Sequence, residues 1–101
     1  LMTYNLLMEI CFDKESKRKQ PIMNNYRPGF KIKEKGFFSG KIHLIDNENL
    51  MPGCCSIAIV GFFSNQPFID VKEGDIFDFY EVPNKIGISK LIKVIGWKDL
   101  I

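Results

Sequence analysis

Short runs of alternating apolar and polar residues, separated by turn residues, are the feature that most constrains the fold of this chain. Alternation with a period of two places successive side chains on opposite faces of a strand, and no stretch requires a helix of ordinary length. The runs predict six strands, at residues 4–12, 30–35, 37–45, 56–63, 76–80 and 86–97. This pattern favours an all-β fold, a small closed antiparallel β-barrel of the Greek-key kind, with residues 1–101 as a single domain.

The charges are distributed unevenly along the chain, although the net charge is only +2. Residues 14–35 contain eight basic and two acidic residues, whereas residues 70–81 contain five acidic residues and one lysine. In the predicted strand at 30–35, Lys31, Lys33 and Lys35 would share one face, and residues 17–19 form a basic loop. Both clusters could neutralise phosphates of a nucleic acid, or they could form a solvated face that keeps an edge strand from aggregating.

The sequence contains no assembled catalytic constellation. Cys11, Cys54 and Cys55 are an odd number without a CxxC spacing, which predicts neither a disulfide framework nor a zinc site. Because neighbouring strand residues point to opposite faces, Cys54 and Cys55 are not expected to bond to each other. We interpret all three as reduced thiols of a cytoplasmic protein. His43 is the single histidine, and one histidine does not make a metal site.

These observations predict a non-catalytic binding module rather than an enzyme. We expect no cofactor and no metal ion, and no small-molecule substrate is identified. The longest uncharged apolar run, residues 53–63, is too short to span a membrane, so no membrane partner is expected.

One part of the chain is specific rather than generic. The five residues at positions 24–28 resemble a segment of the C-terminal β-barrel domain (domain III) of translation elongation factor Tu. Further residues of the chain match the same domain in order and spacing. The resemblance covers residues 4–93. The residues that carry it are Asn24, Asn25, Tyr26, Arg27 and Pro28, then Phe30, residues 39–44, Met51, Pro52, Gly53, Gln66, Pro67, residues 77–81, Ile86 and Gly87.

The resemblance implies candidate RNA contacts in two segments. In elongation factor Tu this domain helps to hold the T-stem of aminoacyl-tRNA by its backbone, packs on the GTPase domain and meets the nucleotide-exchange factor. The corresponding residues here are Arg18, Lys19 and Gln20, in the basic loop, and Glu81. Arg18 and Glu81 match the family, whereas Lys19 and Gln20 do not.

A further departure lies directly after Glu81. Val82 and Pro83 stand where the family has two glycines, and their side chains would crowd an RNA backbone that approached the main chain there. The GTPase domain and the middle barrel of the family are not part of this sequence, so the resemblance implies a fold and not GTP hydrolysis.

Three functions are compatible with these residues. The leading hypothesis is a protein-interaction module that docks on a GTPase domain or a translation factor. It rests on the charge split and on the adjacent pairs Phe37-Phe38 and Phe62-Phe63, of which one ring each would point outward. The first alternative is binding of tRNA or another RNA through Lys17 and the other basic residues of 14–35. The second is that the chain is the C-terminal domain of a longer elongation-factor-like GTPase.

Several of the matched residues have structural interpretations. We expect Arg27 to brace carbonyl groups or a carboxylate in a tight turn. Pro52 and Gly53 supply a fixed and then a permissive backbone angle before the strand at 56–63. Gly87 is expected at a close approach of two backbones.

Overall fold

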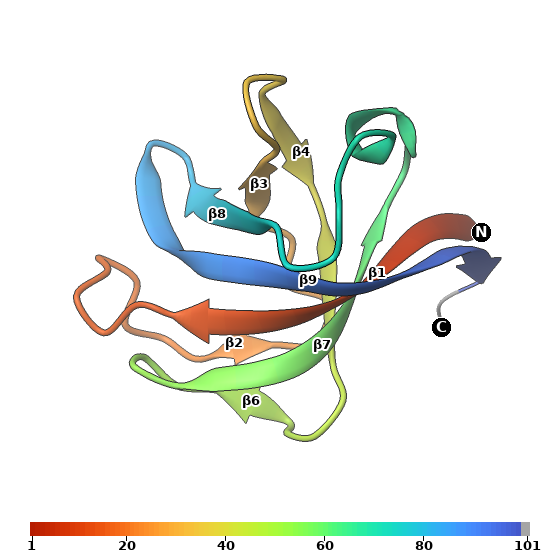
Figure 1. Ribbon diagram of the computed structural model, residues 1–101. Helices are drawn as coiled ribbons and strands as arrows, with labels where there is room; N and C mark the ends of the chain where they lie inside the picture. The colour runs from red at the N-terminus through yellow and green to blue at the C-terminus, as the bar shows by residue number, and fades with distance from the viewer. Residues whose placement is uncertain (100–101) are drawn as a thin grey trace.

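The computed structural model describes residues 1–99, and its regular secondary structure consists of β-strands apart from one short 3₁₀ helix, so the all-β prediction is confirmed. Seven strands form one antiparallel sheet in the order β4-β3-β8-β9-β1-β7-β5, and two short strands, β2 and β6, form a separate pair (Figure 1). The elements are β1 (Met2–Phe12), β2 (Ile22–Met23), β3 (Gly29–Lys31), β4 (Phe37–Ser39), β5 (Lys41–Leu44), β6 (Asn49–Leu50), β7 (Cys55–Phe62), the 3₁₀ helix η1 (Gln66–Phe68), β8 (Ile76–Glu81) and β9 (Asn84–Asp99).

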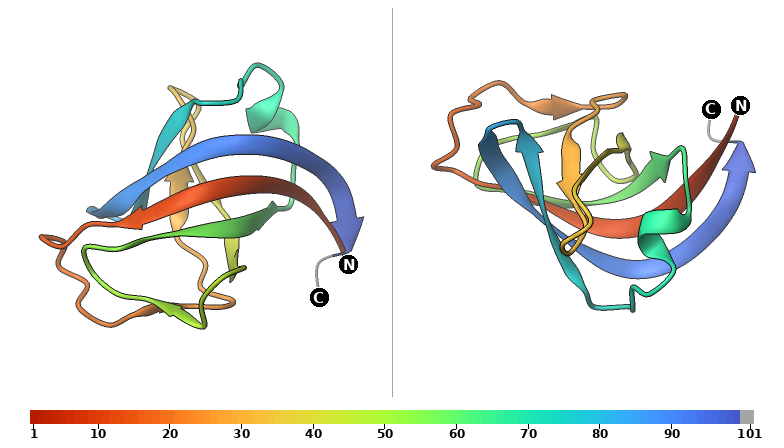
Figure 2. Two further views of the ribbon diagram at one scale, coloured as in Figure 1. Left: turned by 60° about the horizontal axis from the view of Figure 1, so that its bottom comes forward. Right: turned by 90° about the horizontal axis from the view of Figure 1, so that it is seen from above.

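The centre of the sheet is β1, which is paired with β7 on one side and with β9 on the other. Its register with β9 runs from Met2 opposite Asp99 to Phe12 opposite Gly87. Figure 2 shows these three strands curving together. Their inner face and the facing strands enclose an apolar core. Its fully buried members include Leu6, Met8, Ile10, Phe30, Ile42, Val60, Phe79 and Leu91.

The prediction of six strands is wrong, because residues 1–99 contain nine. The strand expected at 30–35 ends at Lys31. Lys33 adopts a left-handed backbone conformation (φ +52°), and the amide of Ile32 donates to the carbonyl of Gly36 at 3.0 Å, which closes a hairpin turn. Lys33 and Lys35 therefore lie in this turn and not on a strand face with Lys31, as the alternation suggested.

The strand expected at 37–45 is divided at Gly40 into β4 and β5. These two strands pair with different neighbours, β4 with β3 and β5 with β7, and so they stand at opposite ends of the strand order. Within residues 1–99 no pairing of β4 with β5 is found, and the expected closed barrel is not found as a ring of paired strands.

The prediction for the cysteines is also wrong. Cys11 on β1 and Cys55 on β7 lie opposite each other in the register, with Cα atoms 4.1 Å apart, and they form a disulfide. Cys54 keeps a free thiol and is exposed. The partner of Cys55 is 44 residues away in the sequence and is supplied by strand pairing. Because disulfides are rare in cytosolic proteins, the cysteines no longer support a cytoplasmic location.

Gly87 lies where β9 passes closely over the end of β1. A Cβ atom at this position would overlap the carbonyl oxygen of Cys11 and would lie 2.8 Å from Cζ of Phe79. Backbone atoms cannot move aside as a flexible side chain can, so only glycine fits here without a shift of one strand.

We expect Gly87→Ala to lower the free energy of unfolding by about 2–4 kcal/mol, because the methyl group must displace either the β1 backbone or a core aromatic ring. Urea denaturation measures the loss. Gly29→Ala is the matched control, since the nearest atom to a Cβ there is 3.6 Å away. Equal stabilities of the two variants would contradict the close approach at Gly87.

The disulfide yields a second prediction. Cys11→Ser is expected to lower the free energy of unfolding by about 3 kcal/mol, because the closed loop no longer restricts the unfolded chain. Reduction of the wild-type protein should cause a similar loss in urea denaturation, and Cys54→Ser should cause little. A Cys11→Ser variant as stable as the oxidised wild type would show that the bond does not constrain the fold.

Candidate nucleic-acid interface

Two segments that the sequence indicates separately, residues 17–20 and Glu81, lie together in the structure. The amide of Asp13 donates to the carbonyl of Ile86 at 2.9 Å, so the loop that follows β1 begins beside the start of β9. The turn at 82–83 joins Glu81 on β8 to Asn84 on β9. Between the loop and the turn lies a polar hollow of about 410 Å³, lined by Lys17, Arg18, Lys19, Gln20, Glu81, Asn84 and Ile86.

Arg18 organises the wall of this hollow. Its guanidinium donates to the carbonyls of Gln20 (Nε, 3.1 Å) and Pro21 (Nη2, 2.8 Å) and to Oε1 of Glu81 (Nη1, 3.1 Å). The same group lies 4.3 Å from the centroid of the Tyr26 ring, a cation–π contact. The Arg18 side chain is only 20% exposed. Its fork of donors therefore holds the loop to β8, and little of its charge faces solvent.

Tyr26 supplies an aromatic surface and no charge. Burial raises the pKa of the Tyr26 hydroxyl well above its ordinary value, the Glu81 carboxylate raises it further, and Arg18 opposes the rise. The hydroxyl oxygen is buried and has no hydrogen-bond partner within residues 1–99. Tyr26 is therefore neutral at any physiological pH, and its ring packs against the Arg18 guanidinium.

Lys17 and Lys19 carry the positive charge that the hollow presents. In the described part of the chain, neither has a carboxylate within 4.0 Å. The ammonium group of Lys19 donates to the carbonyl of Lys14 at 3.3 Å, which holds the side chain on the loop without neutralising it. These two lysines are the cations that a ligand in the hollow would meet.

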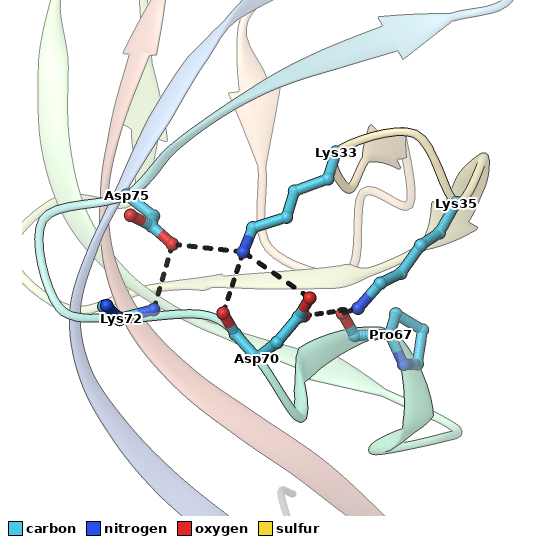
Figure 3. Close-up of polar contacts among 6 residues, drawn as sticks. All are labelled: Lys33, Lys35, Pro67, Asp70, Lys72 and Asp75. Atoms are coloured by element: carbon cyan, nitrogen blue, oxygen red, sulfur yellow. Dashed lines mark hydrogen bonds and ion pairs between the residues drawn. The ribbon is translucent and has the colours of Figure 1, made fainter.

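Lys33 and Lys35 do not join this hollow. From the β3–β4 hairpin they reach across to the loop between β7 and β8 (Figure 3). Lys33 Nζ donates to the carbonyl of Asp70 at 2.8 Å and lies 3.7 Å from Asp70 Oδ2 and 4.0 Å from Asp75 Oδ2. Lys35 forms an ion pair with Asp70 and donates to the carbonyl of Pro67 at 2.9 Å. Part of the basic segment is thus neutralised by the acidic segment of the same chain.

Lys31 is separate from both groups. It is exposed on β3, opposite Phe37 of β4. The eight candidate RNA contacts therefore divide into five residues around one hollow, two in ion pairs with Asp70, and Lys31 alone.

The asparagines of the 24–28 block organise the backbone. Oδ1 of Asn24 accepts a hydrogen bond from the amide of Leu44 at 2.7 Å, which ties the block to β5. Asn25 adopts a positive φ of +77°, and its amide donates to the carbonyl of Ile42 at 2.9 Å. Asparagine tolerates this left-handed conformation better than most residues.

The bracing role expected of Arg27 is not found in residues 1–99, where Arg18 performs it instead. The Arg27 guanidinium lies 5.6 Å from the centroid of the Phe63 ring. Pro28 is buried, and its carbonyl accepts a hydrogen bond from the amide of Gly40 at 3.1 Å. Pro52 and Gly53 lie in a turn before β7, where Gly53 has a φ of +84°.

Sequence reasoning missed Asn84 and Ile86, which complete the hollow. Neither belongs to a charged cluster, and both enter the hollow only because β9 begins beside the loop after β1. A signal for them existed in the Val82-Pro83 turn, which marks where β8 reverses into β9.

The chain matches no known family model, and no curated protein sequence matches it significantly. Among residues 1–99, no helix has the length and apolar character needed to cross a membrane.

The ion pairs of Asp70 yield a pH prediction. The hydrogen bond from Lys35, followed by the charges of Lys33 and Lys35, lowers the pKa of Asp70 below its ordinary value, although desolvation opposes the shift. Since the folded-state pKa lies below the unfolded value, the stabilisation is present above the unfolded pKa and is lost as the pH falls through the lowered pKa.

We therefore expect the Asp70 carboxyl to titrate below the ordinary range of an aspartate in an NMR experiment. Asp70→Asn should lose less stability than the wild type when the pH is lowered through this range. A midpoint for Asp70 at or above the ordinary value of an aspartate would show that the lysines do not hold its carboxylate.

Proposed function

We propose that the chain is a non-catalytic binding module whose polar hollow holds the phosphate backbone of an RNA helix, such as a stem of tRNA. The meeting of residues 17–20 with Glu81 and Asn84 around one hollow carries the proposal. Lys17 and Lys19 supply cations without a carboxylate partner in residues 1–99. The amide groups of Gln20 and Asn84 can donate hydrogen bonds to phosphate oxygens.

The turn at Val82 and Pro83 defines how RNA would approach. Val82, directly after Glu81, is exposed, and its bulk keeps an RNA backbone away from the main chain. Lysine side chains are long enough to reach phosphates across this gap, so they replace the close backbone contact that glycines would permit. Contacts of this kind read phosphate and not base sequence, and the binding is weak and salt-dependent.

We also propose that β4 and β5 act as one strand that closes the sheet into a barrel. Gly40 joins them, and a Cβ atom there would lie 2.7 Å from side-chain atoms of both Val60 and Phe62, so the chain crosses directly over the core. Hydrogen bonds from the amides of Gly40 to Pro28 (3.1 Å) and of Ile42 to Tyr26 (2.8 Å) continue the pairing beyond β3.

A closed barrel fits the resemblance to domain III of elongation factor Tu, and from that resemblance we propose a role in translation. The same resemblance supports the alternative that the chain works beside a GTPase domain, as part of one protein or as a separate partner. GTP hydrolysis would then belong to that domain, and this module would contribute binding only.

The proposal is tested by fluorescence anisotropy with labelled tRNA at low salt. The double variant Lys17→Glu/Lys19→Glu should bind at least about tenfold more weakly than the wild type, because two phosphate contacts become repulsive. Lys90→Glu/Lys93→Glu, on exposed positions of β9, makes the same change in net charge and should leave most of the affinity.

Two results would contradict the proposal. One is no binding of tRNA by the wild type at about 50 mM salt, where contacts to phosphate are strong. The other is an equal loss in both double variants, which would mean that only net charge matters and that the hollow holds nothing.

A further inference from the structure

The two aromatic pairs each present one ring to solvent. Phe37 is 49% exposed and Phe63 is 56% exposed, whereas Phe62 is 2% exposed and Phe38 is half-buried. The two exposed rings come from strands far apart in the strand order, since Phe37 is on β4 and Phe63 directly follows β7. Large exposed rings close to one another indicate a surface that a partner covers.

On one side of Phe63 lies a basic hollow of about 330 Å³, to which Arg27, Lys41 and Gly61 also contribute. The Arg27 guanidinium lies over the Phe63 ring, 5.6 Å from its centroid. In residues 1–99 neither Arg27 nor Lys41 has a carboxylate within 4.0 Å. Asp99 also lines this hollow, but in residues 1–99 its carboxylate lies more than 4.0 Å from the charged groups of Arg27 and Lys41. Two cations here therefore lack a partner.

On the other side of Phe63 lies an apolar hollow of about 240 Å³. Its wall is formed by side chains of β4, of the end of β7 and of the segment that follows, namely Phe37, Phe38, Phe62, Phe63 and Pro67. Because Phe63 lines both hollows, the basic and the apolar one adjoin. Neither shares a residue with the hollow that contains Lys17 and Glu81.

The strand beside the apolar hollow has an edge without a partner strand in residues 1–99, because the proposed closure runs through the pairing of β5 with β7, and β7 ends at Phe62. β4 is at the end of the strand order and pairs with β3 alone in residues 1–99. The main-chain donors and acceptors on its other edge are available to an added strand. A nucleic acid could stack bases on Phe37 and Phe63. Only a peptide, however, can pair its main chain with the unpaired main-chain groups of a strand edge, so this edge favours a peptide.

We infer that this surface docks an extended peptide of a partner protein, one that carries large apolar side chains next to a carboxylate. The peptide lies along β4 and places an apolar side chain in the hollow between Phe38 and Pro67. Its carboxylate meets Arg27 and Lys41. The inferred site is separate from the proposed RNA site and does not depend on it.

The experiment is an NMR titration of the ¹⁵N-labelled protein with two synthetic peptides. The probes are acetyl-Glu-Phe-Val-Phe-Glu-amide and its basic counterpart, acetyl-Lys-Phe-Val-Phe-Lys-amide. The acidic peptide should shift the amide signals of Phe37, Ser39 and Phe63, and it should bind about tenfold more tightly than the basic one, because it meets two unpaired cations. Arg27→Glu should remove this preference.

Lys90→Glu is the matched control, because it reverses an exposed charge on β9 away from the site and should leave the preference intact. Arg27 and Lys90 are exposed, and retained signal dispersion shows that each variant is folded. The inference is overturned by equal binding of the two peptides, by signal shifts elsewhere, or by no binding at millimolar peptide. Tighter binding of oligouridine at the same residues would overturn it as well, in favour of single-stranded RNA.

Discussion

The antiparallel register of β1 with β9 is the constraint on which the rest of the structure depends. It sets Phe12, the last residue of β1, opposite Gly87, near the start of β9. The loop that leaves β1 and the turn that enters β9 must therefore lie side by side. Arg18 on that loop meets Glu81 across the junction, and the polar hollow is the space between the two segments. Gly87 makes this possible, because any side chain there would separate the strands.

The basic residues of the sequence have two different roles in the structure. One part is internal, since Lys33 and Lys35 hold the hairpin after β3 to the loop that contains Asp70. Such exposed ion pairs are worth little individually, but they fix the position of two loops. The other part remains on the surface, in Lys17 and Lys19 at one hollow and in Arg27 and Lys41 at another. The two lysines paired with Asp70 are not free to attract a ligand, so the positive charge of residues 14–35 is larger than the charge available to bind RNA.

The sequence predicted the fold class well, because alternation in β1, β7 and β9 follows directly from strands with one face in the core. The strand prediction failed at residues 30–35. Ile32 is buried there, and the alternation of apolar and polar residues continues into the turn, so the sequence pattern of this hairpin is the same as that of a strand. The pairing of Cys11 with Cys55 could not be predicted either, because the local sequence pattern does not determine the register between strands that are far apart in the sequence.

The candidate site was predicted in part. Arg18 was predicted both from the basic loop at 17–19 and from the resemblance, whereas Glu81 was predicted from the resemblance alone, and their contact depends on the β1–β9 register. The outward rings of Phe37 and Phe63 followed from strand geometry, since neighbours in a strand face opposite ways. The bracing role expected of Arg27 belongs to Arg18, because the carbonyls of Gln20 and Pro21 lie within reach of the Arg18 guanidinium.

The central claim is that Lys17 and Lys19 contact RNA phosphates at the hollow, and the salt dependence of binding tests it most directly. Two phosphate contacts predict that the logarithm of the association constant falls with the logarithm of salt concentration with a slope of about −2. Replacing both lysines by alanine should bring the slope close to zero. An unchanged slope in that variant would mean that RNA, if bound, is held elsewhere on the protein, and the account of the hollow would be wrong.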